Sequence, residues 1–393
     1  MKFLHIGDVH INKSFVTKDE GLSRLLKARL KKSFNNAVDY CIKNDLDALL
    51  IAGDLFDHYP VELDAKLTVI EAFKRLEAHQ IMVLYCSGNH DPSGLNSPLL
   101  TMAFPENVKT FFDDQYQVHT LHDRSNQAYD FIGCGHIDAH ETRPLLRDFP
   151  RGDYIGLVHA NVTSGDLEED KDYLPCDLKT LKDLDYKYLA LGHIHIGGSL
   201  NDQATINYSG CLMGMNANET GKKGGYLVEI DPSGCRSTFV PLAGLTYETL
   251  DLDLRDVTTL DGCFDLILNE VRTSYQDQDQ YSLSLYLRGK TSLYAKLKET
   301  GVMDQLRSSL LEYLDLVDIK LVDETRVLYD GAAYRRDNSV LGAVLESLDH
   351  LKTSGDLGTI QLLQAYSPQE LEDLLDQMED DLLTLFLEGY DEN

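Results

Sequence analysis

The stretch Ala48-Leu49-Leu50-Ile51-Ala52-Gly53-Asp54-Leu55-Phe56-Asp57 contains a short apolar run that stops at a glycine and is followed at once by a carboxylate. Apolar runs of this length, closed by glycine, are typical of buried strands that are covered on both faces. A buried strand has no packing reason to end in two acids three residues apart. Asp54 and Asp57 therefore indicate a functional site at the exposed tip of this strand.

Four further apolar runs end in the same way. They span residues 1–6, 81–86, 154–158 and 188–191, and they are followed by Gly7-Asp8-Val9-His10, Ser87-Gly88-Asn89-His90-Asp91, His159 and Gly192-His193-Ile194-His195. Side chains at positions i and i+2 leave a strand on the same face, so Asp8 and His10 can point at one ion. Each motif alone is weak, but five strand-like runs that all end in oxygen or imidazole ligands form a specific pattern.

The candidate ligands share one chemical feature, because they offer oxygen and imidazole atoms and no thiolate: Asp8, His10, Asp54, Asn89, His159, His193 and His195. This donor set suits hard or borderline divalent ions better than a structural cysteine-type zinc site. Two-metal phosphatases and nucleases hold their ions roughly 3.5–4 Å apart, which requires a bridging ligand. Asp54 lies centrally among the motifs and is the expected bridge.

Composition limits the remaining possibilities. A length of 393 residues allows two or three domains, and the seven cysteines are scattered, which favours reduced thiols in a cytoplasmic protein. No apolar segment reaches the roughly eighteen residues of a membrane span, and we expect no signal peptide. The net charge of −29 argues against a chain that coats nucleic acid unaided. Basic residues are densest at 24–32, either as a phosphate-facing patch or as a solvated helix face.

These motifs, taken together, resemble the calcineurin-like metallophosphoesterase superfamily. Within it, Leu4–His10, Ala52–Asp57 and Leu191–His195 resemble the SbcD family of DNA-repair exonucleases, especially its bacterial YhaO-type branch. Tyr208-Ser209-Gly210 and Asn218–Tyr226 resemble the segment that closes the phosphoesterase core of that family. The resemblance covers about residues 1–245. It implies an α/β fold (an α+β sandwich) in which two facing mixed β-sheets are flanked by helices.

The resemblance also implies roles for the site residues. Asp8, His10, Asp54 and His195 would hold the first of two divalent ions, and Asp54, Asn89, His159 and His193 the second. Manganese is the expected metal, with iron or zinc as alternatives. His90 matches a histidine that binds no metal and assists the leaving group, and Asp57 matches the carboxylate that orients it in related phosphatases. Archaeal and eukaryotic nucleases of the family usually carry a histidine at the position of Asp57, which leaves its role open.

Two segments follow the expected nuclease domain of residues 1–245. Residues 246–330 alternate between strand and helix patterns, with helical structure expected over 291–314, and resemble the α/β capping domain with which this family selects DNA ends. The last segment, 337–393, is expected to form two helices, the second beginning with the capping box Ser367-Pro368-Gln369-Glu370. Its apolar stripe from Leu371 to Phe386 either packs on the protein itself or docks on a partner.

The sequence therefore predicts a two-metal DNA exonuclease or endonuclease that hydrolyses phosphodiester bonds, as the nuclease subunit of an SbcCD-like repair complex. Its expected partners are DNA and an SbcC-like coiled-coil ATPase, with a homodimer also open and no membrane association. The alternative is a metallophosphoesterase that acts on small nucleotides or other phosphodiesters, which the acidity of the chain would suit. A non-catalytic scaffold is the third possibility, and the complete set of ligands argues against it.

Overall fold

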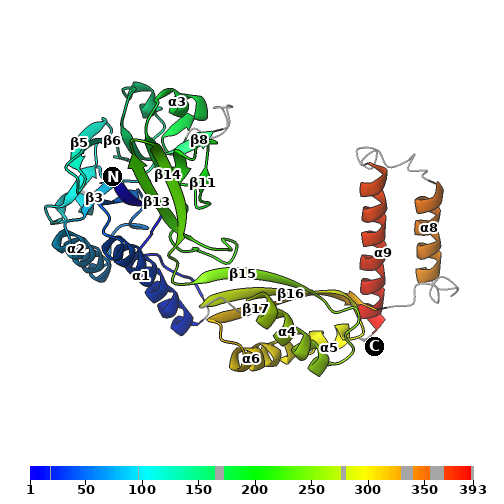
Figure 1. Ribbon diagram of the computed structural model, residues 1–393. Coiled ribbons are helices and arrows are strands. Elements are labelled where there is room, and N and C mark those ends of the chain that lie inside the picture. The colour runs from blue at the N-terminus through cyan, green and yellow to red at the C-terminus, as the bar shows by residue number, and fades with distance from the viewer. Residues whose placement is uncertain are drawn as a thin grey trace. The chain divides into compact units, whose positions relative to one another are not determined.

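The computed structural model describes residues 1–17, 19–95, 97–163, 172–275, 280–328, 340–354 and 367–390. The chain divides into two compact units, shown as ribbons in Figure 1. The first comprises residues 1–248 and 279–283, and the second comprises residues 249–278 and 284–393. None of the described helices combines the length and the apolar character needed to cross a bilayer.

The first unit contains two six-stranded mixed sheets, which confirms the predicted fold class. The first sheet has the order β14-β13-β1-β2-β3-β4, with bounds Gly234–Pro241, Gly224–Asp231, Lys2–Ile6, Ala48–Ala52, Met82–Cys86 and Val108–Phe111. The second has the order β11-β12-β10-β7-β6-β5, with bounds Gly198–Ser199, Ile206–Tyr208, Tyr188–Gly192, Ile155–His159, Ala128–Gly133 and Gln117–His122. A separate short pair joins β8 (Asn161–Thr163) and β9 (Pro175–Asp177).

Alternation along the buried strands explains how the layers pack. In β2, Leu49 and Ile51 pack in the core formed with helices α1 (Glu20–Lys43) and α2 (Leu63–Ala78). Their neighbours Leu50 and Ala52 face the opposite way, into the layer between the two sheets. Because successive side chains of a strand point to opposite faces, a strand buried on both faces reads as a continuous apolar run. Helix α3 (Leu178–Asp183) contributes to a third apolar layer, beyond the second sheet.

The strands that precede the predicted ligands are parallel within each sheet. In the first sheet, Ile6 pairs with Ile51 and Ala52 pairs with Cys86. In the second sheet, Gly192 pairs with His159 at the ends of β10 and β7. Parallel strands in this register finish at the same edge of their sheet, so the segments that follow them lie together.

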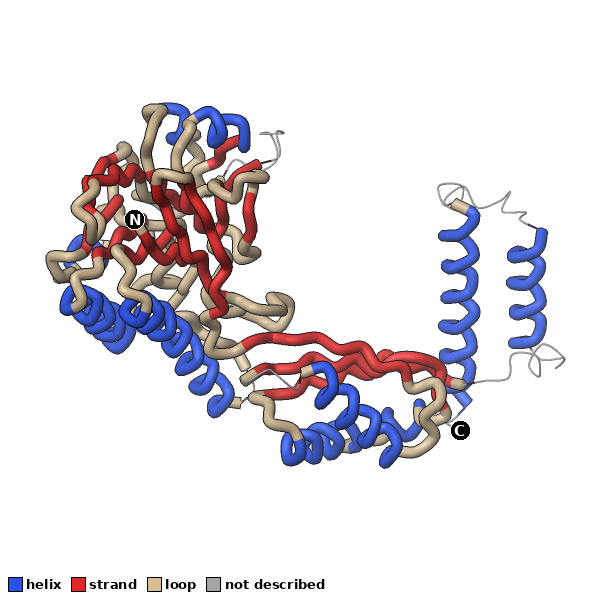
Figure 2. The backbone as a smooth tube through the Cα atoms, viewed as in Figure 1, coloured by secondary structure: helices blue, strands red, loops and turns tan. Residues whose placement is uncertain are grey.

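Most of a three-stranded sheet of order β15-β16-β17 belongs to the second unit, with strand bounds Thr246–Asp253, Tyr281–Thr291 and Asp318–Val327. Helices α4 (Leu260–Ser274), α5 (Tyr294–Lys298) and α6 (Val302–Tyr313) lie along one face of this sheet, as Figure 2 shows. The helical region expected over 291–314 contains the two helices α5 and α6. Gly301 separates them with a φ of 85°, a left-handed conformation that glycine adopts without steric cost.

The helices of the C-terminal segment are α8 (Val340–Ser354) and α9 (Pro368–Tyr390). The capping box is confirmed, since the Ser367 amide donates to Glu370 Oε2 (2.7 Å) and the Glu370 amide donates to Ser367 Oγ (3.4 Å). The two helices pack on each other through one apolar cluster that includes Leu341, Leu345, Leu348, Leu375 and Leu383. Residues 337–339, 355–366 and 391–393 of the predicted tail lie outside the described residues.

Candidate metal centre

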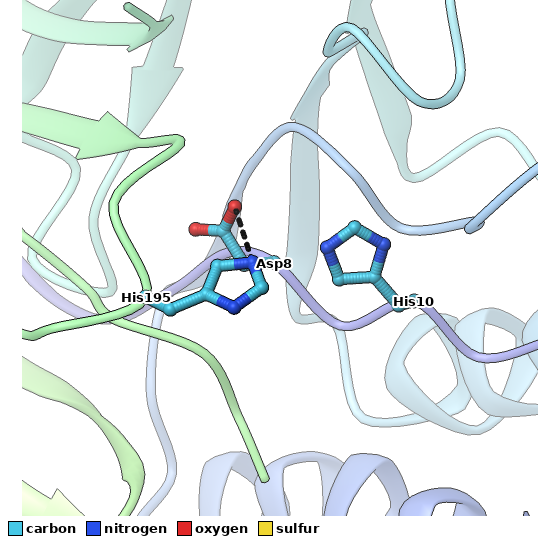
Figure 3. Close-up of side chains that lie close together, drawn as sticks. All are labelled: Asp8, His10 and His195. Atoms are coloured by element: carbon cyan, nitrogen blue, oxygen red, sulfur yellow. Dashed lines mark ion pairs between the residues drawn. The ribbon is translucent and has the colours of Figure 1, made fainter. Parts of the chain in front are cut away.

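The predicted ligands of the first ion lie close together, on turns that follow β1, β2 and β10. Asp8 Oδ1 lies 3.9 Å from His195 Nε2, and His10 Nε2 lies 3.8 Å from Asp54 Oδ2. Figure 3 shows the carboxylate of Asp8 and the rings of His10 and His195 gathered at one place, although they come from distant parts of the sequence.

The predicted ligands of the second ion lie beside the first group. Asn89 Oδ1 is 2.8 Å from His159 Nε2 and 3.1 Å from His193 Nδ1. Asp54 Oδ2 lies 3.4 Å from His159 Nε2 as well as facing His10, so its carboxylate stands between the two groups. The structure thus brings all seven sequence-predicted ligands into one cluster, with Asp54 at its centre.

The backbone at this cluster adopts an uncommon conformation. Asp8, His10, Asp54 and His193 have φ values of 47°, 50°, 50° and 103°, in a region that side-chain-bearing residues rarely occupy. Each such residue costs on the order of 1–3 kcal/mol and persists only where surrounding contacts hold it, which is characteristic of functional sites. The main chain at these turns is therefore strained, and the strain lowers local stability in order to position the candidate ligand side chains.

Two glycines allow the strand ends of the two sheets to meet. A Cβ on Gly192 would lie 1.7 Å from the carbonyl oxygen of Ala52, and a Cβ on Gly53 would lie 2.4 Å from His159 Nδ1. Because both positions carry only hydrogen, the end of β2 approaches the ends of β10 and β7 closely enough for His159 Nδ1 to lie 2.9 Å from the Ala52 carbonyl oxygen. This contact directs His159 Nε2 into the cluster.

The electrostatics of the cluster fit divalent ions. Asp8 and Asp54 are buried side by side, and burial together with the charge of Asp54 raises the pKa of Asp8 to about 8. Burial lowers the pKa of His159 to about 3, which keeps its imidazole neutral as a metal ligand must be. In the buried ring of His10, Nε2 has no hydrogen bond within the described chain, whereas Nδ1 lies 3.1 Å from Asp57 Oδ1. Neighbouring carboxylates and an imidazole nitrogen without a hydrogen bond are the arrangement that a bound cation would stabilise.

The contacts of His90 and Asp57 differ from the expected carboxylate–histidine pair. His90 Nδ1 lies 2.7 Å from the backbone carbonyl of Asp57 but 3.9 Å from its carboxylate. The carboxylate oxygen Oδ1 instead lies 3.1 Å from both His10 Nδ1 and Lys13 Nζ. Although burial raises the pKa of Asp57, its contacts with His10, His58 and Lys13 lower it by more, so the group is ionised. Asp57 therefore supports a candidate ligand, and its main chain orients His90.

Asp91 is a site residue to which sequence reasoning assigned no role. Its buried carboxylate accepts hydrogen bonds from the amides of Leu55 (2.8 Å) and Gly88 (2.7 Å), and from those of Asp54 and Phe56. It thereby ties the turn that carries Asp54 to the turn that carries Asn89. Its only signal in the sequence is its place at the end of Gly88-Asn89-His90-Asp91.

Glu219 is the second residue that sequence reasoning missed, although the segment that contains it was noted. Its Oε1 atom lies 3.0 Å from His195 Nδ1, on the side of the ring away from Asp8. Glu219 Oε2 accepts the amide of Met215 (2.8 Å), which holds the carboxylate in place. Carboxylates of this kind orient metal-binding histidines in many proteins.

The histidines left without a role in the sequence fall into separate environments. His136 is buried and its Nε2 lies 2.7 Å from the carbonyl oxygen of His159, so it supports the backbone of a candidate ligand. His58 is exposed beside Asp57. His119, His122 and His140 belong to none of the ligand groups in the described part of the chain.

The two-sheet fold and the histidine–carboxylate donor set define the class as a metal-dependent phosphoesterase. Residues 1–197 match the calcineurin-like phosphoesterase family, and the chain belongs to this family. It is 24% identical over 381 residues to the uncharacterised metallophosphoesterase YhaO of Bacillus subtilis, covering 89% of this chain and 90% of the relative. It is 23% identical over 412 residues to the DNA double-strand break repair protein Mre11 of Saccharolobus solfataricus, covering 96% and 97%. A third relative, Mre11 of Aeropyrum pernix, is 26% identical over 249 residues, or 59% of this chain and 58% of the relative.

Proposed function

We propose that this protein is a two-metal phosphodiesterase that cleaves DNA, as an exonuclease or endonuclease in the repair of broken ends. The observation that carries the proposal is the single cluster formed by all seven predicted ligands around Asp54. The similarity to Mre11 along nearly the full chain supports DNA as the substrate, because that relative is a DNA double-strand break repair protein.

In this proposal, Asp8, His10, Asp54 and His195 hold one ion, and Asp54, Asn89, His159 and His193 hold the other. Manganese is the proposed metal. The bound ions would supply an activated water and stabilise negative charge on the phosphodiester oxygens. The lowered pKa of His159 favours the neutral imidazole that a ligand needs, whereas the raised pKa of Asp8 means that its carboxyl would release a proton when a metal binds.

His90 is proposed to act on the substrate and not on a metal. Its backbone amide donates to Asp54 Oδ1 (2.9 Å), and its ring packs edge-on against His10, with centroids 4.8 Å apart. If Nδ1 donates to the carbonyl of Asp57, Nε2 faces away and is available for a proton transfer with the departing oxygen. Its side chain is partly exposed, which leaves room for a phosphodiester.

The remaining segments receive roles by analogy with the family. Residues 246–330 would select DNA ends as a capping domain, and residues 337–393 would dock on a coiled-coil ATPase of the SbcC kind in the cytoplasm. A partner with a basic surface would compensate for the net charge of −29, which opposes binding of DNA by the chain alone.

The experiment compares the wild type with Asp54→Asn on linear duplex DNA and on the small ester bis(p-nitrophenyl) phosphate, with Mn²⁺. Asparagine keeps the volume and can keep the bond to the His90 amide, but it removes the charge between the two ions. We expect the variant to lose metal and nearly all turnover while its melting temperature in chelator stays close to that of the wild type. Two bound ions and near-normal turnover in the variant would contradict the two-metal assignment.

The acidity of the chain favours one rival, a phosphodiesterase for small nucleotides. The same assay separates the two functions. Cleavage of the small ester and of dinucleotides, with no cleavage of duplex or single-stranded DNA even when the ATPase is present, would establish the rival.

A further inference from the structure

A hollow of about 340 Å³ lies beside the candidate metal centre and belongs entirely to the first unit. Its wall includes His195, one of the proposed ligands of the first ion. The segment after β10, the segment between β12 and β13, and the paired strands β13 and β14 form the rest of the wall. None of the site residues derived above other than His195 lines this hollow.

The charge of the hollow is opposite to that of the chain. Lys222 and Lys223 line it, and no aspartate or glutamate does, although the chain has 65 acids and 36 basic residues. Neither lysine forms an ion pair with a carboxylate in the described part of the chain, in contrast to Lys27 and Lys31 of α1, which pair with Glu62 and Asp64. Two unpaired cations beside a phosphoesterase centre favour an anionic ligand.

The hollow also presents an aromatic surface. Tyr226 and Phe239 are direct cross-strand neighbours on β13 and β14, with ring centroids 5.8 Å apart. The side chain of Phe239 is 37% exposed, and Ile196, on the opposite segment, is 75% exposed. Exposed aromatic rings next to basic groups are the usual surface on which nucleic-acid bases stack.

Glycine allows two backbone segments of the wall to come close together. Gly210 has a φ of 71°, and a Cβ there would lie 2.6 Å from the amide nitrogen of Gly197. The two segments can therefore touch only without side chains at these positions; Gly210 is buried by the contact, whereas Gly197 is exposed.

We infer that this hollow binds one nucleotide next to the scissile phosphate, with a phosphate held by Lys222 and Lys223 and a base or sugar against Phe239. The inference rests on the proposed function and names the subsite through which that function would recognise a nucleic-acid strand. Such a subsite would explain how an acidic chain can bind a polyanionic substrate, because Lys222 and Lys223 lie where the substrate binds.

The test measures calorimetrically how thymidine 5′-monophosphate and inorganic phosphate bind to the full chain in Mn²⁺. We expect the wild type to bind the nucleotide more tightly than inorganic phosphate. Phe239→Ala should weaken nucleotide binding about tenfold, within the usual range for a stacked base, and leave phosphate binding unchanged. Phe239→Trp should bind the nucleotide as tightly as the wild type, because tryptophan also offers a ring for stacking. The double variant Lys222→Ala/Lys223→Ala should weaken the nucleotide at least as much, with a smaller dependence on salt.

Lys74→Ala, on the exposed side of α2, is the matched control and should bind both ligands as the wild type does. Equal affinity of the wild type for nucleotide and phosphate, or unchanged nucleotide binding in both pocket variants, would overturn the inference. The binding measurement does not depend on turnover. If the chain cleaves no DNA, the proposed function is refuted, but the binding data still show whether the hollow binds a nucleotide.

Discussion

At the scale of single residues, three carboxylates that would bind no metal hold the candidate ligands in position. Asp91 accepts four backbone amides from two turns, and Glu219 fixes the ring of His195. Asp57 is likewise placed beside His10. Four candidate ligands have left-handed or similarly unusual φ values, which cost conformational energy. The contacts made by Asp91, Glu219 and Asp57 offset this backbone strain.

Replacing Glu219 tests whether this support tunes the metal. Glu219→Gln should lower the affinity for the first ion about 10–100-fold, because the uncharged amide no longer orients and polarises its ligand His195. Manganese titration followed by activity and by calorimetry measures the change. Glu229→Gln, the same substitution on β13 at an ion pair with Lys2, is the control and should leave metal affinity unaltered. Unchanged metal affinity in Glu219→Gln would leave Glu219 a purely structural residue.

Replacing His90 separates proton transfer from metal binding. His90→Ala should retain both ions but lose roughly 10²–10⁴-fold in turnover, the span usual for general acid–base help. Metal content is measured by elemental analysis alongside the rate, with His79→Ala on an exposed helix end as the control. Loss of an ion from the His90 variant would show that His90 is a ligand.

At the scale of elements, the helices α8 and α9 use their apolar faces to pair with each other. Leu345 and Leu383 are fully buried between them, and Lys352 Nζ bonds Glu379 Oε2 (2.8 Å) and Asp376 Oδ1 (2.5 Å) across the pair. The apolar stripe from Leu371 to Phe386 was predicted to pack on the protein itself or to dock on a partner. Part of this stripe is covered by α8. Leu385 stays 65% exposed, so α8 does not cover the whole apolar stripe of α9.

A substitution in this pair should destabilise the two helices alone. Leu345→Ala removes a buried side chain, a change that typically costs about 2–5 kcal/mol. We expect faster hydrogen exchange throughout 340–354 and 367–390, with unchanged hydrolysis of the small ester. Val340→Ala, at a 72% exposed position of the same helix, should exchange as the wild type does. Full protection of α9 in the Leu345 variant would mean that α9 is stabilised by something other than α8.

At the scale of the whole molecule, charge is distributed unevenly. Residues 336–393 contain 14 acids and 2 basic residues, whereas the hollow beside the metal centre contains lysines and no acid. Such a tail repels DNA and is better suited to a basic protein surface. The basic cluster of α1 is partly neutralised by Glu62 and Asp64 near the start of α2, so it provides less phosphate affinity than its sequence indicates.

Removing residues 337–393 tests the partnership at this scale. The truncated chain should hydrolyse bis(p-nitrophenyl) phosphate at the wild-type rate, because every candidate ligand lies before residue 196. It should no longer co-purify with the proposed coiled-coil ATPase or show ATP-stimulated processing of duplex ends. Capture of the ATPase by the truncated chain would leave the α8–α9 pair as a packing element without a docking role.

The sequence by itself predicted the five strands that precede the candidate ligands and, from them, the seven ligands. This was possible because a strand buried on both faces has a continuous apolar pattern that stops where the polar ligands begin. Asp8 and Asp54 follow neighbouring parallel strands of one sheet, whereas His159 ends a strand of the other sheet, and the structure places all three together.

Only the tertiary structure decided what supports those ligands. Asp57 turns its carboxylate to His10 and Lys13, Asp91 joins two turns, and Glu219 reaches His195 from a segment 24 residues away. The lysine-lined hollow likewise arises where segments following β10 and β12 meet. Strand periodicity records which face of a sheet a residue occupies, but the direction of a turn side chain depends on contacts between loops distant in sequence, which no local pattern encodes.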